Sequence, residues 1–287
     1  MNILVTGSNG QLGNEMRVLS KSHPKHTYFF TDVVESDGVS VLDITDRQAV
    51  SAFVAQNAIE LIVNCAAYTN VDKAEEDEAT AMKINADALS VLGRQGVKVI
   101  HVSTDYVFSG DEYIPCRETD PVAPRTAYGR TKYEGEKRLL AECPEAVILR
   151  TAWLYSSFGN NFVKTMIRLG KERKELGVVF DQIGTPTYAA DLAQAIFTVI
   201  ECPVWHPGIF HFTNEGVCSW YDFTIAIHEL AGIQECQVSP ILSEEYQYKT
   251  PRPHYSVLDK SKFKKTFNVT IPHWMDGLKR CMMSLHS

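Results

Sequence analysis

Short apolar runs of strand length alternate with helix-type periodicity through the first half of the chain. The apolar runs lie at residues 3–6, 27–31, 61–64, 97–103 and 147–151. Between them, apolar side chains recur at helical spacing at residues 11–20, 46–56, 79–95 and 128–142. Strands that alternate with helices in this order predict an α/β fold, in which helices cover both faces of a doubly wound parallel sheet.

Beyond residue 151 the alternation becomes less regular. Residues 160–171, 191–200 and 221–231 have helical patterns, residues 209–212 form another apolar run, and prolines and aromatic residues are frequent from 240 to 272. This composition is typical of a smaller, irregular α/β lobe that lines a cleft. We place the domain boundary at residue 155, with one domain at 1–155 and a second mainly at 156–287. Whether segments of the second domain return to the first is left open.

The composition excludes several classes of protein. The 287 residues are 45% hydrophobic and 22% charged, and 28 basic against 35 acidic residues give a net charge of −7 without a basic patch. Nucleic acid is therefore not an expected partner. No apolar run approaches the roughly 20 residues of a membrane span, and we expect neither a secretory leader nor, in the absence of a His-x-x-x-His pair, a catalytic metal site. Seven cysteines without a Cys-x-x-Cys pair predict reduced thiols and a cytoplasmic location.

A glycine-rich turn follows the first apolar run directly. Gly7, Gly10 and Gly13 have the spacing Gly-x-x-Gly-x-x-Gly, one residue wider than the common Rossmann fingerprint. Glycine allows the backbone to approach a phosphate closely, and the free N–H groups of the following helix face a pyrophosphate. The turn therefore predicts a Rossmann-type dinucleotide site. The alternative is a tight turn that binds no ligand.

Two aspartates follow at positions where a dinucleotide's adenosine half is bound. Asp32 ends the second strand, nineteen residues after Gly13, and no Arg or Lys follows within residues 33–38. A carboxylate there accepts hydrogen bonds from a ribose and repels a 2′-phosphate, so NADH is favoured over NADPH. Asp43 and Ile44 are candidates for the adenine edge and face. Either aspartate is alternatively a turn residue.

Small residues close the third strand, where Ala66 and Ala67 leave room for a ligand or allow tight packing.

Farther along the chain, Tyr128 and Lys132 are four residues apart and share one helical face. A phenol keeps its proton at neutral pH, and a nearby ammonium lowers its pKa. The pair is therefore a candidate proton donor to a carbonyl that receives hydride, with Lys132 holding the nicotinamide ribose. The alternative is a pair of surface residues.

Thr104 and Asp105 follow the fourth strand at its carboxyl end. A hydroxyl at Thr104 can share the substrate oxygen with Tyr128, where negative charge develops. The carboxylate of Asp105 can bind a sugar hydroxyl. The alternatives are a β-branched residue that ends a strand and a turn cap.

These blocks of sequence resemble those of a known family. Residues 7–13 and 128–132 are typical of the extended short-chain dehydrogenases. More closely, nearly the whole chain is similar to the dTDP-4-dehydrorhamnose reductase family, through residues 64–69, 71–75, 103–108, 150–155, 159–162 and 252–253. The resemblance implies an NAD(P)H-dependent oxidoreductase that reduces the C4 keto group of dTDP-6-deoxy-L-lyxo-4-hexulose and yields dTDP-β-L-rhamnose.

The resemblance also implies roles for individual residues. It implies a catalytic set of Thr104, Tyr128 and Lys132. It implies a cofactor site made of Gly7, Gly10, Gln11, Leu12, Gly13, Asp32, Asp43, Ile44, Ala66, Ala67, Tyr68, Thr69, Tyr128 and Lys132. It implies contacts to the sugar nucleotide from Thr104, Asp105, Trp153, Asn161 and Arg252. An aromatic face at Trp153 also suits a sugar's C–H surface, although a core tryptophan is the alternative, and Arg252 is either a diphosphate ligand or a surface arginine.

The chain departs from the family pattern at two positions. Cys65 stands where the family often has alanine, and Ala152 replaces a common serine, which removes a hydroxyl. Some members form a magnesium-bridged homodimer through acidic side chains. Glu15 is a candidate for such a bridge, but the full acidic set is not identifiable. Two other functions remain open: a nucleotide-sugar epimerase or dehydratase with a tightly held cofactor, and a regulatory subunit of methionine adenosyltransferase that serves as a binding partner.

Overall fold

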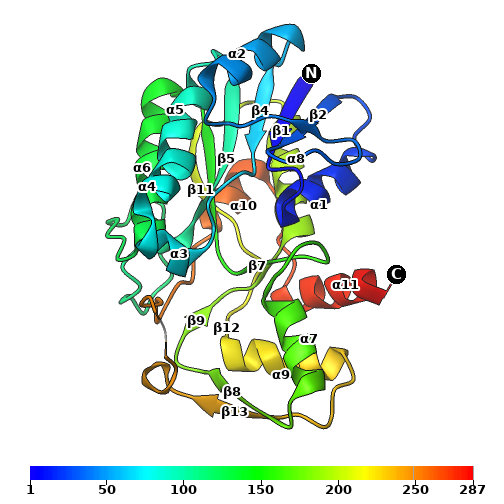
Figure 1. Cartoon of the computed structure of the whole chain (residues 1–287), viewed down its shortest axis with the longest axis vertical. Coiled ribbons are helices and arrows are strands. Elements are labelled where there is room, and N and C mark those ends of the chain that lie inside the picture. The colour runs from blue at the N-terminus through cyan, green and yellow to red at the C-terminus, as the bar shows by residue number, and fades with distance from the viewer. Residues whose placement is uncertain (248, 287) are drawn as a thin grey trace.

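A seven-stranded sheet forms the core of the larger lobe (Figure 1). The computed structural model describes residues 1–247 and 249–286. The strands are all parallel and lie in the order β11-β6-β5-β4-β1-β2-β3. Their bounds are β1 Asn2–Thr6, β2 Thr27–Asp32, β3 Ser40–Val41, β4 Leu61–Asn64, β5 Lys98–Thr104, β6 Val147–Thr151 and β11 Gly208–His211.

Helices cover both faces of this sheet, because alternate residues of its apolar strands point to opposite sides. In β1, Ile3 and Val5 pack with α1, α8 and α10, whereas Leu4 packs with α2, α5 and α6. The doubly wound, Rossmann-type α/β fold predicted from the sequence is confirmed. The helix bounds are α1 Gln11–Ser20, α2 Arg47–Gln56, α5 Ala88–Gly93, α6 Ala127–Glu142, α8 Ala189–Glu201 and α10 Ser261–Phe267.

The helical pattern predicted at residues 79–95 is interrupted in the structure. It consists of α4 (Glu78–Met82), a π-helical turn η1 (Lys83–Asp87) and α5. The buried Asn85 lies in this turn, where its side chain accepts from Tyr68 N at 2.8 Å and donates to Thr131 Oγ1 at 3.1 Å. A single π-helical turn often marks a functional site, and this one lies beside the cavity described below.

The smaller lobe is built from short strand pairs and three helices. The pairs are β7 (Leu154–Tyr155) with β10 (Thr187–Tyr188), β8 (Glu175–Val179) with β13 (Gln237–Ile241), and β9 (Ile183–Gly184) with β12 (Cys218–Ser219). The helices are α7 (Phe162–Glu172), α9 (Trp220–Leu230) and α11 (Trp274–His286), and a 3₁₀ turn η3 spans Ser243–Glu245. The sequence analysis did not foresee the strand pairs, α10 or α11.

Several segments after residue 155 belong to the larger lobe. Strand β11 pairs in parallel with β6, and α8 and α10 pack on the face that also carries α1. The chain thus passes between the lobes more than once (Figure 1), while the boundary at residue 155 stays a prediction. Among the described residues, none of the helices has the length and apolarity that crossing a membrane requires.

Candidate active site

A cavity of about 1010 Å³ opens at the carboxyl ends of the sheet strands. In the order of the strands, β2 and β3 lie on one side of β1, and β4 and β5 lie on its other side. Ligands of doubly wound sheets bind at such a reversal of strand order. Residues of the smaller lobe, from β7, from the segment just before α7 and from the start of α9, complete the wall.

The glycine-rich turn shapes one end of the cavity. Gly7 has a φ of +68°, and a Cβ atom there would lie 2.5 Å from the backbone nitrogen of Ala66. Gly10 caps α1 without a side-chain hydrogen bond, so the first N–H groups of the helix stay available to a ligand. Gly13 does not line the cavity, and its missing side chain instead lets α1 pack against the Gly7 carbonyl.

The features of this end fit a dinucleotide. Gln11 and Leu12 line the cavity, and the buried Oε1 of Gln11 has no hydrogen-bond partner among the described residues. Open N–H groups and an unpartnered side-chain oxygen beside a close-approach glycine suit a pyrophosphate and its riboses.

Both predicted aspartates reach the cavity. Asp32 Oδ2 accepts from Asn9 N at 2.9 Å, and Asp32 Oδ1 accepts from Val33 N at 2.8 Å. Asp43 Oδ1 accepts from Thr45 N at 2.8 Å, so this residue also shapes its own turn. Of the described residues that line the cavity, none is an arginine, and the lysines are Lys83 and Lys132.

The segment after β4 contributes Ala66, Ala67 and Thr69 to the cavity, and the loop between β3 and α2 contributes Ile44. Tyr68, also predicted to bind the cofactor, does not line it. Its ring instead packs on small buried residues of neighbouring helices, and its backbone is fixed by Asn85. Its role at the cofactor stays a prediction.

The catalytic candidates meet in the middle of the cavity. Thr104 ends β5, and Tyr128 and Lys132 lie one turn apart on α6. Tyr128 and Thr104 both line the cavity, and an interaction with the Thr104 side chain acts to lower the pKa of Tyr128. Thr104 Oγ1 donates to Asp105 Oδ1 at 2.9 Å. Two hydroxyls therefore belong to the same part of the cavity wall.

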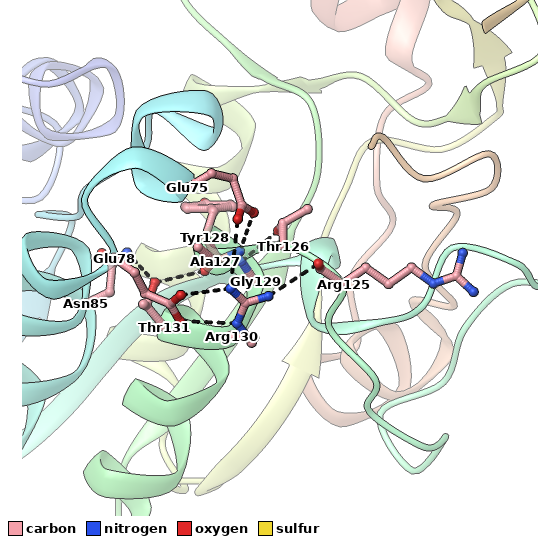
Figure 2. Close-up of polar contacts among 10 residues, drawn as sticks. All are labelled: Glu75, Glu78, Asn85, Arg125, Thr126, Ala127, Tyr128, Gly129, Arg130 and Thr131. Atoms are coloured by element: carbon pink, nitrogen blue, oxygen red, sulfur yellow. Dashed lines mark hydrogen bonds and ion pairs between the residues drawn. The ribbon is translucent and has the colours of Figure 1, made fainter. Parts of the chain in front are cut away.

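The start of α6 is held in place by its neighbours (Figure 2). The Thr126 hydroxyl accepts from Gly129 N at 3.0 Å, and Glu75 on α3 (Val71–Glu76) accepts from Ala127 N at 2.6 Å. Arg130 pairs with Glu78 at 2.8 Å. These contacts fix the first turn of the helix, which carries Tyr128.

Burial raises the pKa of Tyr128, and the hydrogen bond with Thr104 offsets only part of this effect. From the four-residue spacing we expected Lys132 to lower that pKa. The expectation is wrong for the chain without ligands, because Lys132 Nζ instead donates to Val102 O at 2.7 Å and lies 3.1 Å from His101 Nε2. Burial lowers the pKa of Lys132 to about 8.

Asp105 is buried in the short 3₁₀ turn η2 (Asp105–Val107) that follows β5. Burial raises the pKa of its carboxyl to about 7, although hydrogen bonds from Thr104 and Ser256 act in the opposite direction. This elevation above the ordinary value means that folding favours the protonated form, and that this contribution to stability is lost as the pH rises toward and through 7.

We therefore expect Asp105→Asn to be more stable than the wild type above pH 7 and similar to it near pH 4. The pKa difference sets an upper limit of about 4 kcal/mol on the gain in unfolding free energy. Thermal melts of both proteins from pH 4 to 8 measure it. If the difference in melting temperature between the two proteins does not grow with pH, burial of the Asp105 carboxylate does not destabilise the wild type.

The smaller lobe contributes an aromatic wall. Trp153 has a φ of +49°, a strained conformation for a residue with a side chain, and its ring stacks on Trp220 at a centroid distance of 3.4 Å. Both tryptophans line the cavity, so Trp153 is not simply a core residue.

The other two substrate candidates are placed differently. Asn161 lines the cavity, but its side chain caps α7 by accepting from Lys164 N and donates to Ser156 O at 2.7 Å. Arg252 lies outside the cavity and pairs with Asp72 at 2.9 Å. Arg252 Nη1 lies 3.5 Å from the hydroxyl of Tyr106, which itself lines the cavity.

Sequence reasoning missed several cavity residues. Trp220 is the most prominent, because it stacks on Trp153 from a helix 67 positions later in the chain. Its only local signal was a Ser219 cap, which predicts a helix and not a ligand site. Lys83 and Thr80 come from the interrupted helix, whose helical periodicity hid the π-helical turn.

Comparison with known proteins agrees with this arrangement. The model of the RmlD substrate binding domain matches residues 1–287. The chain belongs to the RmlD substrate binding domain family. The dTDP-4-dehydrorhamnose reductase of Aggregatibacter actinomycetemcomitans is 38% identical over 290 residues, which cover 96% of this chain and 97% of that protein.

Two crystal structures of RmlD-like proteins are similar over the full length. A dTDP-4-dehydrorhamnose reductase from Clostridium acetobutylicum has a TM-score of 0.93 at 43% identity and covers 100% of both chains. Another from Bacillus anthracis, in complex with NADP, has a TM-score of 0.90 at 38% identity and covers 99% of both. The predicted membership of this family is confirmed, and the chain is an oxidoreductase of the nicotinamide-dependent class.

Proposed function

We propose that this protein reduces the C4 keto group of dTDP-6-deoxy-L-lyxo-4-hexulose with a reduced nicotinamide cofactor and forms dTDP-β-L-rhamnose. The observation that carries the proposal is that Tyr128, Thr104 and Lys132 line the same cavity. The glycine turn lies on one side of this cavity and the Trp153 wall on the other. Relatives of the whole chain that share this reductase name support the substrate assignment.

A reduced nicotinamide bound in the cavity would supply hydride to the carbonyl carbon, and side chains of this protein would hold and deliver the proton. Because burial raises its pKa, Tyr128 holds its proton through neutral pH and can give it to the carbonyl oxygen as negative charge develops there. Thr104 provides a second hydroxyl at the same oxygen. Lys132 Nζ is held by Val102 O and His101, and its remaining N–H would bind the nicotinamide ribose.

The remaining contacts follow from the cavity wall. The turn at residues 7–13, with Asp32, Asp43, Ile44 and residues 66–69, would hold the dinucleotide, and domain 1–155 supplies all of these groups. Asp105, Trp153 and Asn161 would meet the sugar nucleotide. For Arg252 the pair with Asp72 argues against a direct diphosphate contact in this conformation.

We propose NADH as the preferred cofactor, because the carboxylate of Asp32 lines the cavity at the end of β2, where it would repel a 2′-phosphate, and the described cavity residues include no arginine. Asp32→Ala should raise KM for NADH about tenfold, the typical cost of a lost hydrogen bond to a charged group, and should affect NADPH less. Asp37→Ala is the matched control, since it removes an exposed carboxylate from the same loop without touching the cavity. If the ratio of kcat/KM with NADH to kcat/KM with NADPH is the same in Asp32→Ala as in the wild type, the proposed role of Asp32 is contradicted.

A direct assay tests the function. Purified protein, NADH or NADPH and the dTDP-4-keto sugar are mixed, and the absorbance of the reduced nicotinamide is followed. Oxidation of the cofactor in step with sugar reduction is the expected result. Stoichiometric NAD⁺ in the purified protein, with no net oxidation, would favour an epimerase or dehydratase instead, and co-purification with a synthetase would favour a regulatory subunit.

A homodimer, a bridging Mg²⁺ and a cytoplasmic location stay predictions. Glu15 is buried, and its Oε1 accepts from Ser156 at 2.6 Å. Among residues 1–247 and 249–286, no group of three or more His, Cys, Asp or Glu side chains is arranged to hold a metal ion.

A further inference from the structure

A buried chain of polar side chains runs behind the cavity. Thr6 and Asn64 lie at the ends of β1 and β4, and the Thr6 hydroxyl donates to Asn64 Oδ1 at 2.6 Å. Asn64 Nδ2 lies 2.9 Å from Nδ1 of His101 on β5. The other ring nitrogen of His101, Nε2, lies 3.1 Å from Lys132 Nζ. Each of these four residues is at most 2% exposed, so their polar atoms depend on one another and not on bulk water for hydrogen bonds.

The geometry at Lys132 leaves its ammonium little freedom. An ammonium has three N–H donors and no lone pair. Lys132 directs one donor to Val102 O at 2.7 Å, and His101 Nε2 lies where a second is accepted. Because the donors are tetrahedrally arranged, two fixed directions determine the third. Lys132 also lines the cavity, so the third N–H is the one left for a ligand.

His101 can accept this hydrogen bond because it is neutral. Burial, followed by the positive charge of Lys132, holds the pKa of His101 well below its usual range. A neutral ring that accepts at Nε2 carries its proton on Nδ1, beside the Asn64 amide. That proton requires the Asn64 amide to be turned by half a turn, so that its oxygen faces His101 Nδ1 and its nitrogen donates to the Thr6 hydroxyl. The turn exchanges the donor and acceptor roles given above and gives up the 3.3 Å hydrogen bond from Asn64 Nδ2 to Ala66 O.

Several other charged groups around α6 are paired with one another. Among the described residues, His101 is the titratable side chain in hydrogen-bond contact with Lys132 Nζ. The pairs are Glu136 with Arg150, Glu75 and Glu78 with Arg130, Glu134 and Asp87 with Arg138, and Asp105 and Tyr128 with Thr104. Glu136 acts on Lys132 through its charge alone.

We propose that His101 is a positioning residue of the active site, which accepts a hydrogen bond from the Lys132 ammonium, favours its charged form and aims its remaining N–H into the cavity. Through Asn64 and Thr6 the chain reaches the residue before Gly7, so it joins the lysine to the turn that shapes the cofactor end. The kinetic consequences rest on the proposed reductase function, whereas the geometry does not.

Nitrogen NMR of the ligand-free protein tests the proposal without turnover. Imidazole ¹⁵N shifts distinguish the two neutral tautomers, and His101→Gln identifies the signal. The expected result is a ring that stays neutral from pH 6 to 9 with its proton on Nδ1. A proton on Nε2 would place two N–H groups against each other at Lys132 and overturn the proposal.

Two variants of His101 form a matched pair for kinetics. The side chain of Gln reaches about as far as Nε2 and can present an oxygen to Lys132, whereas that of Asn is too short. His101→Asn should lower kcat/KM about tenfold, the effect of one lost hydrogen bond to a charged group. The fall of its kcat/KM at alkaline pH should begin at a lower pH than in the wild type, because a lysine without its hydrogen-bond acceptor loses its proton more easily. His101→Gln should stay close to the wild type in both respects.

Equal losses in the two variants with an unchanged pH profile would assign His101 a purely structural role and overturn the proposal. Failure of the wild type to reduce any 4-keto sugar nucleotide would instead remove the proposed function. The tautomer measurement would then still decide the role of His101 beside Lys132.

Discussion

Tyr128→Phe is expected to lower kcat about a thousandfold while the dissociation constant of the nicotinamide cofactor changes little. The substitution removes the hydroxyl that meets Thr104 and leaves the ring, which packs edge-on against Tyr106 at 5.5 Å, in place. Loss of a positioned proton donor costs 10²- to 10⁴-fold in rate. Steady-state reduction of the 4-keto sugar gives kcat, and fluorescence titration with NADH gives the dissociation constant.

Tyr133→Phe is the control for this substitution. Tyr133 lies on the same helix and does not line the cavity. Lys137 Nζ lies over its ring, 5.3 Å from the ring centroid. It should retain wild-type kcat. A Tyr128→Phe enzyme that turns over as fast as Tyr133→Phe would refute Tyr128 as the proton donor.

Glu136→Ala should destabilise the protein by about 3–5 kcal/mol. Glu136 on α6 and Arg150 on β6 form a bidentate pair, with N–O distances of 2.9 and 2.7 Å, and each side chain is 1% exposed. Without the carboxylate, a guanidinium that cannot lose its proton stays buried and unpaired. Urea unfolding measures the loss, which corresponds to a fall in melting temperature on the order of 10 °C.

The buried pair can be compared with two other variants. Glu172→Ala removes one partner of the exposed Arg168–Glu172 pair and should cost less than about 1 kcal/mol. The double variant Glu136→Leu with Arg150→Met replaces both charges by apolar groups and should recover most of the lost stability. If the double variant is as unstable as Glu136→Ala, an unpaired charge is not the cause.

The larger lobe could be predicted from sequence because its signals are local. Strands such as β4 are short apolar runs that are buried along their whole length, and the glycine turn follows β1 directly. Tyr128 and Lys132 could be paired from their spacing alone, since a helix brings residues four apart onto one face. The strand-end positions of Thr104 and Ala66 follow from the same rule, that carboxyl ends of parallel strands share one edge.

The rest of the site depends on contacts between distant segments. Nothing near Trp220 indicates that it stacks on Trp153, and nothing near Arg252 indicates its pair with Asp72. The pKa of Tyr128 also could not be obtained from spacing, because it depends on burial and on where Lys132 Nζ is held. Strands β8 and β13 are five residues each and pair across 62 positions, so neither has a local partner that a pattern could reveal.

The return of β11, α8 and α10 to the larger lobe bears on how this architecture can evolve. Phe197, Phe210 and Phe263 come from these late segments, yet they share one apolar core with Ile3 and Val5 of the first strand. A fragment ending at residue 155 would leave β6 as a bare sheet edge and that core half empty. The nucleotide-binding half is therefore not a transferable module, and new sugar specificities have to arise by substitution within one continuous chain and not by exchange of its lobes.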